Sequence, residues 1–310
     1  MAEGDSPTIA RRRVRLALRA ARETAGLTQA DVAEEMAWSL TKVARIEKGE
    51  VSISISDLRA ALQLLGVRDK TRVSSLLADA RIARAHVSKW GWWQRQPFRS
   101  LISDPLRRFI GYEAAASEIR SFAMLYVPGP LQTPEYGTAL SSMWLEPDSN
   151  DAKAMTQAQL DVLVEARRRR QGALLSRLGS VRFFVVADES VFRRPVGGPA
   201  VFASQLRLLV HLSERGLTVL RMLPYDLPVP IANNGSFDLV AVDSSRADSE
   251  VMYRENGMVD EIVEDHADTA RHRRRFEELW RAANDEKDTI EFIKGRIANL
   301  EVNRRGRPSG

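Results

Sequence analysis

Residues 27–49 (LTQADVAEEMAWSLTKVARIEKG) contain side chains whose types and spacing suit hydrogen bonding to nucleic-acid bases and phosphates. The pattern predicts two short helices joined by a tight turn. Thr28 and Asp31 have the spacing of a capping box at the first helix, and Ser39 can cap the second. Gly49 is a natural end for the second helix, because glycine readily adopts a left-handed conformation. The segment is therefore predicted to be a helix-turn-helix.

The second helix of this segment has a buried and an exposed face at helical spacing. Val43 and Ile46 fall on the buried face, so the opposite face can enter a DNA major groove. We expect Thr41 and Arg45 to contact bases, with Arg45 at a guanine edge. Leu40 is expected to contact a thymine methyl group. An ordinary helical hairpin in a protein core is the simpler alternative, but it does not require the caps, the turn and the polar face to agree.

The same segment resembles the helix-turn-helix of Xre/Cro-type, phage-repressor-like regulators. The resemblance is carried by residues 27–29 (LTQ), by Ala33 at the expected helix crossing and by residues 45–49 (RIEKG). The sequence departs from the pattern in the turn, where such regulators often have glycine. Ala37 there implies strain or different backbone dihedrals, and Trp38 is expected to fill the core beneath it.

Three further residues complete the predicted DNA-binding set. Lys42 is expected at a phosphate, as is Gln29, for which the resemblance also implies this contact. Ser39 begins the helix that reads the bases. Double-stranded DNA is thus the predicted partner. A homodimer is expected, because a single module of this type buries little surface and two half-sites increase affinity.

The flanking sequence predicts an all-α, five-helix domain over residues 9–88. Apolar residues recur at helical spacing in residues 9–25, 54–65 and 68–86. Residues 1–8 are expected to form a disordered lead, and no apolar signal-peptide core follows them.

Charge and composition support this organisation. Residues 1–90 contain 16 Lys and Arg against 11 Asp and Glu, whereas the remainder contains 30 of each. Long-range attraction to phosphate would therefore act on the N-terminal part. The absence of cysteine excludes disulfides and thiolate metal sites and fits a reducing cytoplasm. No apolar run reaches the roughly 20 residues that span a bilayer, so no membrane association is expected.

The sequence pattern of residues 106–302 predicts an α/β (α+β) domain with a mixed sheet and flanking helices. A connector at residues 89–105 is expected before it, and a flexible tail at residues 303–310 after it. Strands are expected at residues 181–187 and 218–223, and a hairpin is expected to pair residues 236–242 with 251–254. Helices are expected over residues 106–126, from Pro134, and over 156–178, 199–215, 267–283 and 287–300.

Several motifs of this region resemble those of WhiJ-type actinobacterial regulators. These motifs are Gly91-Trp92-Trp93, residues 110–116 (IGYEAAA), 127–136 (VPGPLQTPEY), 167–171 (RRRRQ) and 188–198 (DESVFRRPVGG). Such proteins join an Xre-like domain to a large C-terminal domain of unassigned chemistry and are often described as antitoxin-like. The resemblance implies a small acidic or neutral partner protein encoded nearby. The sequence departs from it at Pro130, and at Gly137-Thr138, where Ala-Arg is usual; a partner or ligand contact of that arginine would be lost here.

Two groups of residues could suggest catalysis or metal binding. Asp188 and Glu189 follow a strand, but adjacent side chains point apart, and Arg193 and Arg194 can neutralise them. A structural ion-pair cluster is therefore favoured.

The second group is His266 and His272 with Asp265 and Asp268. A separation of six does not place the two histidines on one helical face. The sequence contains no Walker loop, no dinucleotide-binding glycine motif, no nucleophile elbow and no zinc-protease motif. No catalytic residue, cofactor or metal is predicted.

The arginine run 167–170 could be a second nucleic-acid patch. Four successive positions spread around a helix, however, and Glu165 can pair with Arg169, so a solvated or interface-facing helix is favoured. Trp90, Trp92 and Trp93 are expected to pack between domains.

The sequence therefore favours a cytoplasmic, sequence-specific transcription factor that is not an enzyme. Its second domain would form the dimer and sense a partner protein or a small-molecule effector. The alternative is an antitoxin-like interaction module that binds a small partner protein and autoregulates by binding DNA.

Overall fold

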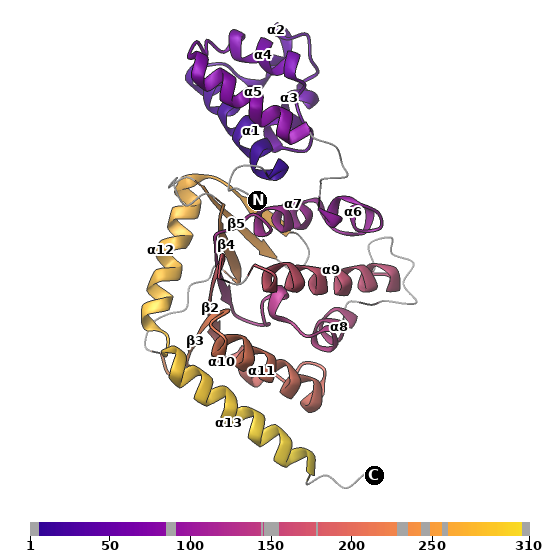
Figure 1. Cartoon of the computed structure of the whole chain (residues 1–310), viewed down its shortest axis with the longest axis vertical. Coiled ribbons are helices and arrows are strands. Elements are labelled where there is room, and N and C mark those ends of the chain that lie inside the picture. Colours follow the sequence, from indigo (N-terminus) through magenta and orange to yellow (C-terminus); the bar gives the residue numbers. More distant parts are fainter. Residues whose placement is uncertain are drawn as a thin grey trace. The chain divides into compact units, whose positions relative to one another are not determined.

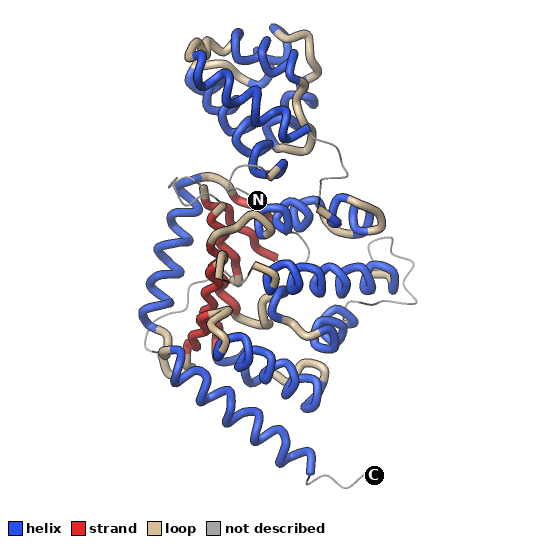
Figure 2. Tube along the Cα trace, in the orientation of Figure 1, coloured by secondary structure: helices blue, strands red, loops and turns tan. Residues whose placement is uncertain are grey.

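A computed structural model of the chain describes residues 6–84, 91–143, 145, 155–177, 179–227, 235–242, 249–255 and 260–305. The chain divides into two compact units, residues 1–91 and 92–310 (Figures 1 and 2). In the described part of the chain, no helix combines the length and the apolar character needed to cross a membrane.

The first unit is all-helical, as predicted. Its helices are α1 (Pro7–Thr24), α2 (Gln29–Glu35), α3 (Leu40–Lys48), α4 (Ile55–Leu64) and α5 (Lys70–Arg84). Helix α1 begins inside the predicted disordered lead, because Pro7 is well suited to the first position of a helix. Residues 1–5 of that lead lie outside the described residues.

The predicted caps of α2 and α3 are confirmed. The Thr28 side chain accepts a hydrogen bond from the Asp31 amide, and the Asp31 carboxylate accepts one from the Thr28 amide. The Ser39 hydroxyl accepts a hydrogen bond from the Lys42 amide at 3.1 Å. Gly49 ends α3 in the left-handed conformation, with a φ of 77°.

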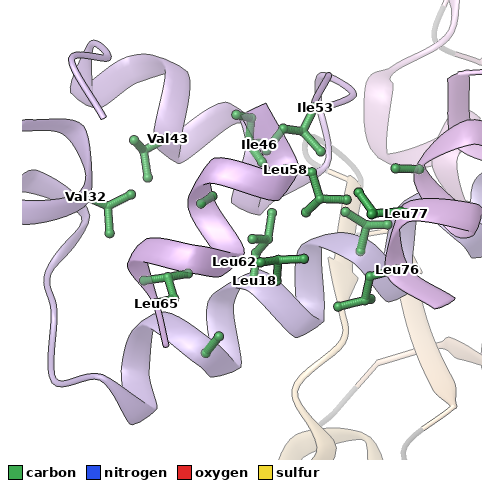
Figure 3. Packing of buried hydrophobic residues seen from close by; sticks show 14 of the residues in the cluster. Leu18, Val32, Val43, Ile46, Ile53, Leu58, Leu62, Leu65, Leu76 and Leu77 are labelled. Carbon is green, nitrogen blue, oxygen red and sulfur yellow. The ribbon is translucent and has the colours of Figure 1, made fainter. Parts of the chain in front are cut away.

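One hydrophobic core connects the helices of this unit. Trp38 and Met36 are partly buried and pack against it, so Trp38 fills the space beneath the turn as expected. The buried side chains that Figure 3 labels are Leu18, Val32, Val43, Ile46, Ile53, Leu58, Leu62, Leu65, Leu76 and Leu77.

The second unit contains a six-stranded mixed sheet, as predicted. Its strand order is β3-β2-β1-β4-β5-β6, in which β1 is parallel to β2, β2 is parallel to β3, and the other neighbours are antiparallel. The strands are β1 (Glu118–Ala123), β2 (Arg182–Asp188), β3 (Val219–Leu223), β4 (Phe237–Ala241), β5 (Glu250–Glu255) and β6 (Asp260–Val263).

Helices cover both faces of this sheet (Figure 1). Helix α12 packs on one face through Phe276 and Leu279, and α7 and α9 lie on the opposite side. The helical elements are η2 (Trp92–Gln94), α6 (Phe98–Leu101), α7 (Asp104–Glu113), η3 (Gly129–Leu131), α8 (Pro134–Ser142), α9 (Gln157–Leu175), α10 (Glu189–Arg193), α11 (Gly198–Glu214), α12 (His266–Ala282) and α13 (Glu286–Arg305).

The helix predicted over residues 106–126 is wrong in its second half. Helix α7 ends at Glu113, and residues 118–123 form strand β1. Ile119 and Phe122 have helical spacing, but β1 lies inside the sheet and is buried along almost its whole length, so it lacks the alternation of a half-buried strand.

The predicted connector and tail also differ from the structure. The connector contains η2 and α6, and Phe98 is buried in a cluster with Val162 and Ala166 of α9. These residues therefore belong to the second unit. Helix α13 continues through Arg305, into the predicted tail. Trp90 and residues 306–310 lie outside the described residues.

The turn between α2 and α3 provides a test of backbone strain. Ala37 has a φ of 51°, which a side chain disfavours and glycine tolerates. Ala37→Gly should therefore increase the free energy of unfolding of residues 1–91 by about 0.5 kcal/mol, as measured by urea unfolding followed by circular dichroism. The control Ala30→Gly, within helix α2, should decrease it by about 0.5–1 kcal/mol. A loss of stability in both variants would contradict the strained turn.

Candidate nucleic-acid interface and a buried polar centre

Helix α3 presents a row of polar and apolar groups to solvent. Val43 and Ile46 are buried in the core, whereas Leu40, Thr41 and Arg45 are exposed. Leu40 is 54% exposed and is the only exposed large hydrophobic side chain in the described part of the first unit. The row thus offers a methyl-contacting group, a hydroxyl and a guanidinium, which are the groups that read base edges.

The two cations of α3 lie beside carboxylates from the following segment. Lys42 Nζ lies 3.1 Å from Asp57 Oδ2 and 4.0 Å from the centre of the Trp38 ring. Arg45 Nε lies 3.4 Å from Glu50 Oε2. The Arg45 pair is exposed and the Lys42 pair is partly exposed, so each contributes little to stability, and a phosphate or a base can replace the carboxylate at little cost.

The other two predicted contact residues have structural roles in the free protein. Ser39 caps α3. Gln29 donates from Nε2 to Glu47 Oε2 at 2.8 Å. The predicted phosphate contact of Gln29 must therefore form together with, or in exchange for, this hydrogen bond.

A buried ion pair between α1 and α3 could not be found by sequence reasoning. Arg22 donates from Nε and Nη2 to the two carboxylate oxygens of Glu47, at 2.6 and 3.0 Å. The two side chains are only 12% and 9% exposed, and the hydrogen bond to Glu47 raises the pKa of Arg22. A bidentate pair fixes orientation as well as distance, so it sets the position of α3 against α1.

A buried polar centre lies in the middle of the second unit. Ser121, Asp238 and Tyr253 are register partners on β1, β4 and β5, so they face the same side of the sheet. On that side, Arg170 of α9 donates to the two carboxylate oxygens of Glu113 at 2.9 and 2.7 Å. Both side chains of the pair are 9% exposed. Burial raises the pKa of Asp238 to about 6.

Arg170 of the arginine run 167–170 contributes to this centre, so of the predicted solvated or interface-facing helix the solvated reading is wrong for Arg170. Arg168 and Arg169 do pair with Glu165, each at 2.6 Å. Arg167 donates from Nη1 to the Ser141 hydroxyl at 2.7 Å and thereby connects α9 to α8. The sequence shows that this run is positively charged, but it does not show which of the arginines pairs with a buried carboxylate.

Three glutamines hold the backbone of residues 127–136. Gln132 donates from Nε2 to the Val127 carbonyl at 2.7 Å, and Gln171 of α9 donates to the Gln132 carbonyl at 3.1 Å. Gln205 of α11 binds the backbone on both sides of Gln132, at 2.8 and 2.7 Å. This motif is therefore an anchored loop between β1 and α8.

Two family models match the chain. A helix-turn-helix domain matches residues 14–76, and a domain of unknown function, DUF5753, matches residues 106–295, which is more than half of the chain. The chain belongs to the DUF5753 family. No curated protein and no solved structure matches it. The first unit is thus a helix-turn-helix DNA-binding domain, whereas the Xre/Cro-type and WhiJ-type assignments remain predictions.

The acidic pair of the DUF5753 domain is tied into the fold. Asp188 caps α10 by accepting from the Ser190 amide at 2.9 Å, and the Ser190 hydroxyl donates to the backbone after β1 at 2.6 Å. Glu189 pairs with Arg193 and accepts from the backbone after β3 at 2.9 Å. Of the predicted ion-pair cluster, the pair of Glu189 with Arg193 is confirmed, whereas Asp188 acts as a helix cap. These contacts join the ends of three parallel strands.

One of the two histidines of α12 also has structural contacts. His272 Nδ1 lies 2.8 Å from the Asp268 carbonyl oxygen, and its ring meets Phe237 edge to face at 5.2 Å. Across the residues that the structure describes, no three side chains from histidine, cysteine, aspartate or glutamate gather as metal ligands.

The exposed row on α3 yields a prediction about base reading. Arg45→Ala should weaken binding to the preferred DNA site by on the order of 1–3 kcal/mol and relax the preference at one base position. The site is obtained by selection from random DNA, and affinity is measured by fluorescence anisotropy. The control Arg72→Ala removes a cation from α5 and should change affinity only slightly. Equal weakening of Arg45→Ala on preferred and random DNA would contradict a base contact.

The polar centre yields a prediction about pH. Because the folded-state pKa of Asp238 lies near 6, above its ordinary value of 3.8, the folded state holds this proton more tightly than the unfolded chain. The stabilisation is fully present below pH 3.8 and is lost as the pH rises through 6. Asp238→Asn keeps a hydrogen-bond acceptor for Ser121 and should be more stable than wild type at pH 7 by on the order of 1–3 kcal/mol.

Urea unfolding at pH 4, 5.5 and 7 measures this difference, which should nearly vanish at pH 4. Asp161→Asn, on the exposed side of α9, is the control and should show no gain. An Asp238→Asn variant that is no more stable than wild type at pH 7 would show that Asp238 is not penalised by burial.

Proposed function

We propose that the protein is a sequence-specific transcriptional regulator of Xre/Cro type that binds double-stranded DNA as a homodimer. The observation that carries this proposal is the exposed row of Leu40, Thr41 and Arg45 on α3. The caps and the Arg22–Glu47 ion pair hold that helix in a fixed orientation. A rigid helix with base-reading groups on its outer face suits insertion into the major groove.

Dimer formation is assigned to the DUF5753 domain. The apolar side chains of the five helices pack into the core of the first unit itself. A single small module also buries too little surface for tight specific binding, so two half-sites about one helical turn apart are expected. The second unit, with equal numbers of acidic and basic residues, has no net charge to attract DNA.

The DUF5753 domain acts by binding and not by turnover in this proposal. Its most suggestive carboxylates, Asp188 and Glu189, accept hydrogen bonds from the backbone, and Glu189 also pairs with Arg193. Groups engaged in this way are poorly placed for acid–base chemistry. The domain is proposed to sense a small ligand or a partner protein and to change the DNA affinity of the dimer.

Two fragments divided at the unit boundary test the division of labour. Residues 1–91 should be monomeric and bind DNA weakly, with most of the salt dependence of the full chain, because they contain its whole charge excess. Residues 92–310 should keep the oligomeric state and bind no DNA. Analytical ultracentrifugation and fluorescence anisotropy across a salt series measure both properties.

Two outcomes would contradict this division. Dimerisation of residues 1–91 with full-length affinity would remove dimer formation from the DUF5753 domain. DNA binding by residues 92–310 would point to the exposed members of the arginine run, above all Arg168.

A further inference from the structure

Two exposed apolar side chains follow parallel strands of the DUF5753 domain. Strands β1, β2 and β3 run in the same direction, so their last residues meet at one edge of the sheet. Leu125 follows β1 and is 46% exposed, and Tyr225 follows β3 and is 61% exposed. They are two of the four exposed large hydrophobic side chains in the described part of this domain. This edge of the sheet therefore presents apolar groups to solvent.

The loops that carry these side chains are fixed at the edge. The Tyr225 amide donates to Glu189 Oε2 at 2.9 Å, and Ser190 donates from its hydroxyl to the Met124 carbonyl at 2.6 Å. Met124 and Leu227 pack against one hydrophobic cluster of the sheet. The exposed side chains thus stand on ordered loops, so a partner that covers them orders few additional groups.

A guanidinium group lies against the exposed tyrosine ring. Arg193 Cζ is 5.6 Å from the centre of the Tyr225 ring and 5.2 Å from the centre of the Phe292 ring in α13. The Nε of Arg193 pairs with Glu189, whereas its two Nη groups donate no hydrogen bond to any described residue. The side chain is 45% exposed. Arg193 therefore presents oriented N–H donors to solvent beside Tyr225.

An exposed carboxylate directly follows the tyrosine. The side chain of Asp226 makes no hydrogen bond or ion pair within the part of the chain that the structure describes. Its charge is opposite to that of Arg193, although the two are not paired with each other. A cation, an aromatic ring and an anion therefore lie together on one surface. Such a surface can be complementary to itself, because a twofold axis can place the cation of one copy opposite the anion of the other.

We propose that this surface is the dimer interface of the DUF5753 domain and that it binds a second copy of the chain. Tyr225 of each copy packs near the twofold axis, and Arg193 of each copy pairs with Asp226 of the other. Tyrosine and arginine are enriched among the residues that contribute most of the binding energy at the centre of an interface. Leu125 extends the apolar contact along the edge. This inference rests on the dimer of the proposed function and names the surface that forms it.

The oligomeric state of the full chain tests this surface. Sedimentation equilibrium over a range of protein concentrations gives the dissociation constant of the dimer. Tyr225→Ser should raise this constant at least about thirtyfold, because it removes a central aromatic contact from both copies at once. The ring is mostly exposed in the single chain, so the variant should keep its fold, which circular dichroism measures.

A graded series at Asp226 tests the charge pairing. Asp226→Asn removes the anion and should weaken the dimer, whereas Asp226→Arg places like charges opposite each other and should raise the dissociation constant further, by about tenfold or more. Two controls change matched residues elsewhere in the domain. Val302→Ser alters a side chain of α13 that is 68% exposed, and Asp161→Arg reverses an exposed charge on α9. Both controls should dimerise as wild type does.

The outcomes separate a failure of this surface from a failure of the proposed function. A wild-type dimer that persists unchanged in Tyr225→Ser and Asp226→Arg contradicts this surface and leaves the proposed dimer intact. A wild-type chain that is monomeric at every concentration contradicts both. DNA recognition is measured separately by fluorescence anisotropy on a single selected half-site, where wild type and Tyr225→Ser should bind equally. Absence of specific binding by both would contradict the regulator proposal, whereas loss of the dimer in Tyr225→Ser alone supports this surface.

Discussion

The buried ion pair between Glu113 and Arg170 fixes the interior of the DUF5753 domain. It joins the last residue of α7 to the C-terminal part of α9, and removal of either partner would leave an uncompensated buried charge, at a cost of roughly 3–5 kcal/mol. The guanidinium also lies over the Phe109 ring at 5.5 Å, and a Cβ at Gly129 would be 3.1 Å from its Nη1. Glycine at this position of the loop after β1 leaves room for the guanidinium, since a side chain there would make a tight contact with it. One side chain thus sets the rotation of α9, which in turn directs Arg167 toward α8 and Gln171 toward the anchored loop.

In the first unit, too, one carboxylate holds several helices together. Glu47 receives hydrogen bonds from Arg22 of α1 and from Gln29 of α2, so one carboxylate on α3 joins three helices. The Gln29 amide nitrogen carries two hydrogens, and Glu47 takes one of them. The second can reach a phosphate without loss of the first bond. The expected phosphate contact of Gln29 and its observed bond to Glu47 are therefore compatible, and together they would relate the position of the DNA backbone to the orientation of α3.

Local signals in the sequence were sufficient for the first unit and for the isolated helices of the second. The caps at Thr28 and Ser39, the stop at Gly49 and the helix of residues 156–178 all depend on interactions within a few residues. Strand β1 was misread because burial on both sides removes the period of two on which strand recognition depends. The partners of Arg170 and of the backbone of residues 127–136 could not be found for a different reason. Glu113 is 57 residues from Arg170, and Gln205 is 74 residues from the carbonyl that it binds, so only the tertiary fold brings them together.

Helices α8 and α9 are held in the domain by different kinds of contact. The Glu113–Arg170 pair holds the C-terminal part of α9, and Arg169 connects this helix to Trp92 and Phe98 through cation–π contacts at 5.4 and 4.7 Å. Helix α8 is attached to α9 by the hydrogen bond from Arg167 to Ser141, and its Tyr136 and Leu140 side chains are buried. The position of α8 therefore depends more on the packing of large side chains, whereas that of α9 depends on an ion pair and cation–π contacts whose geometry is directional.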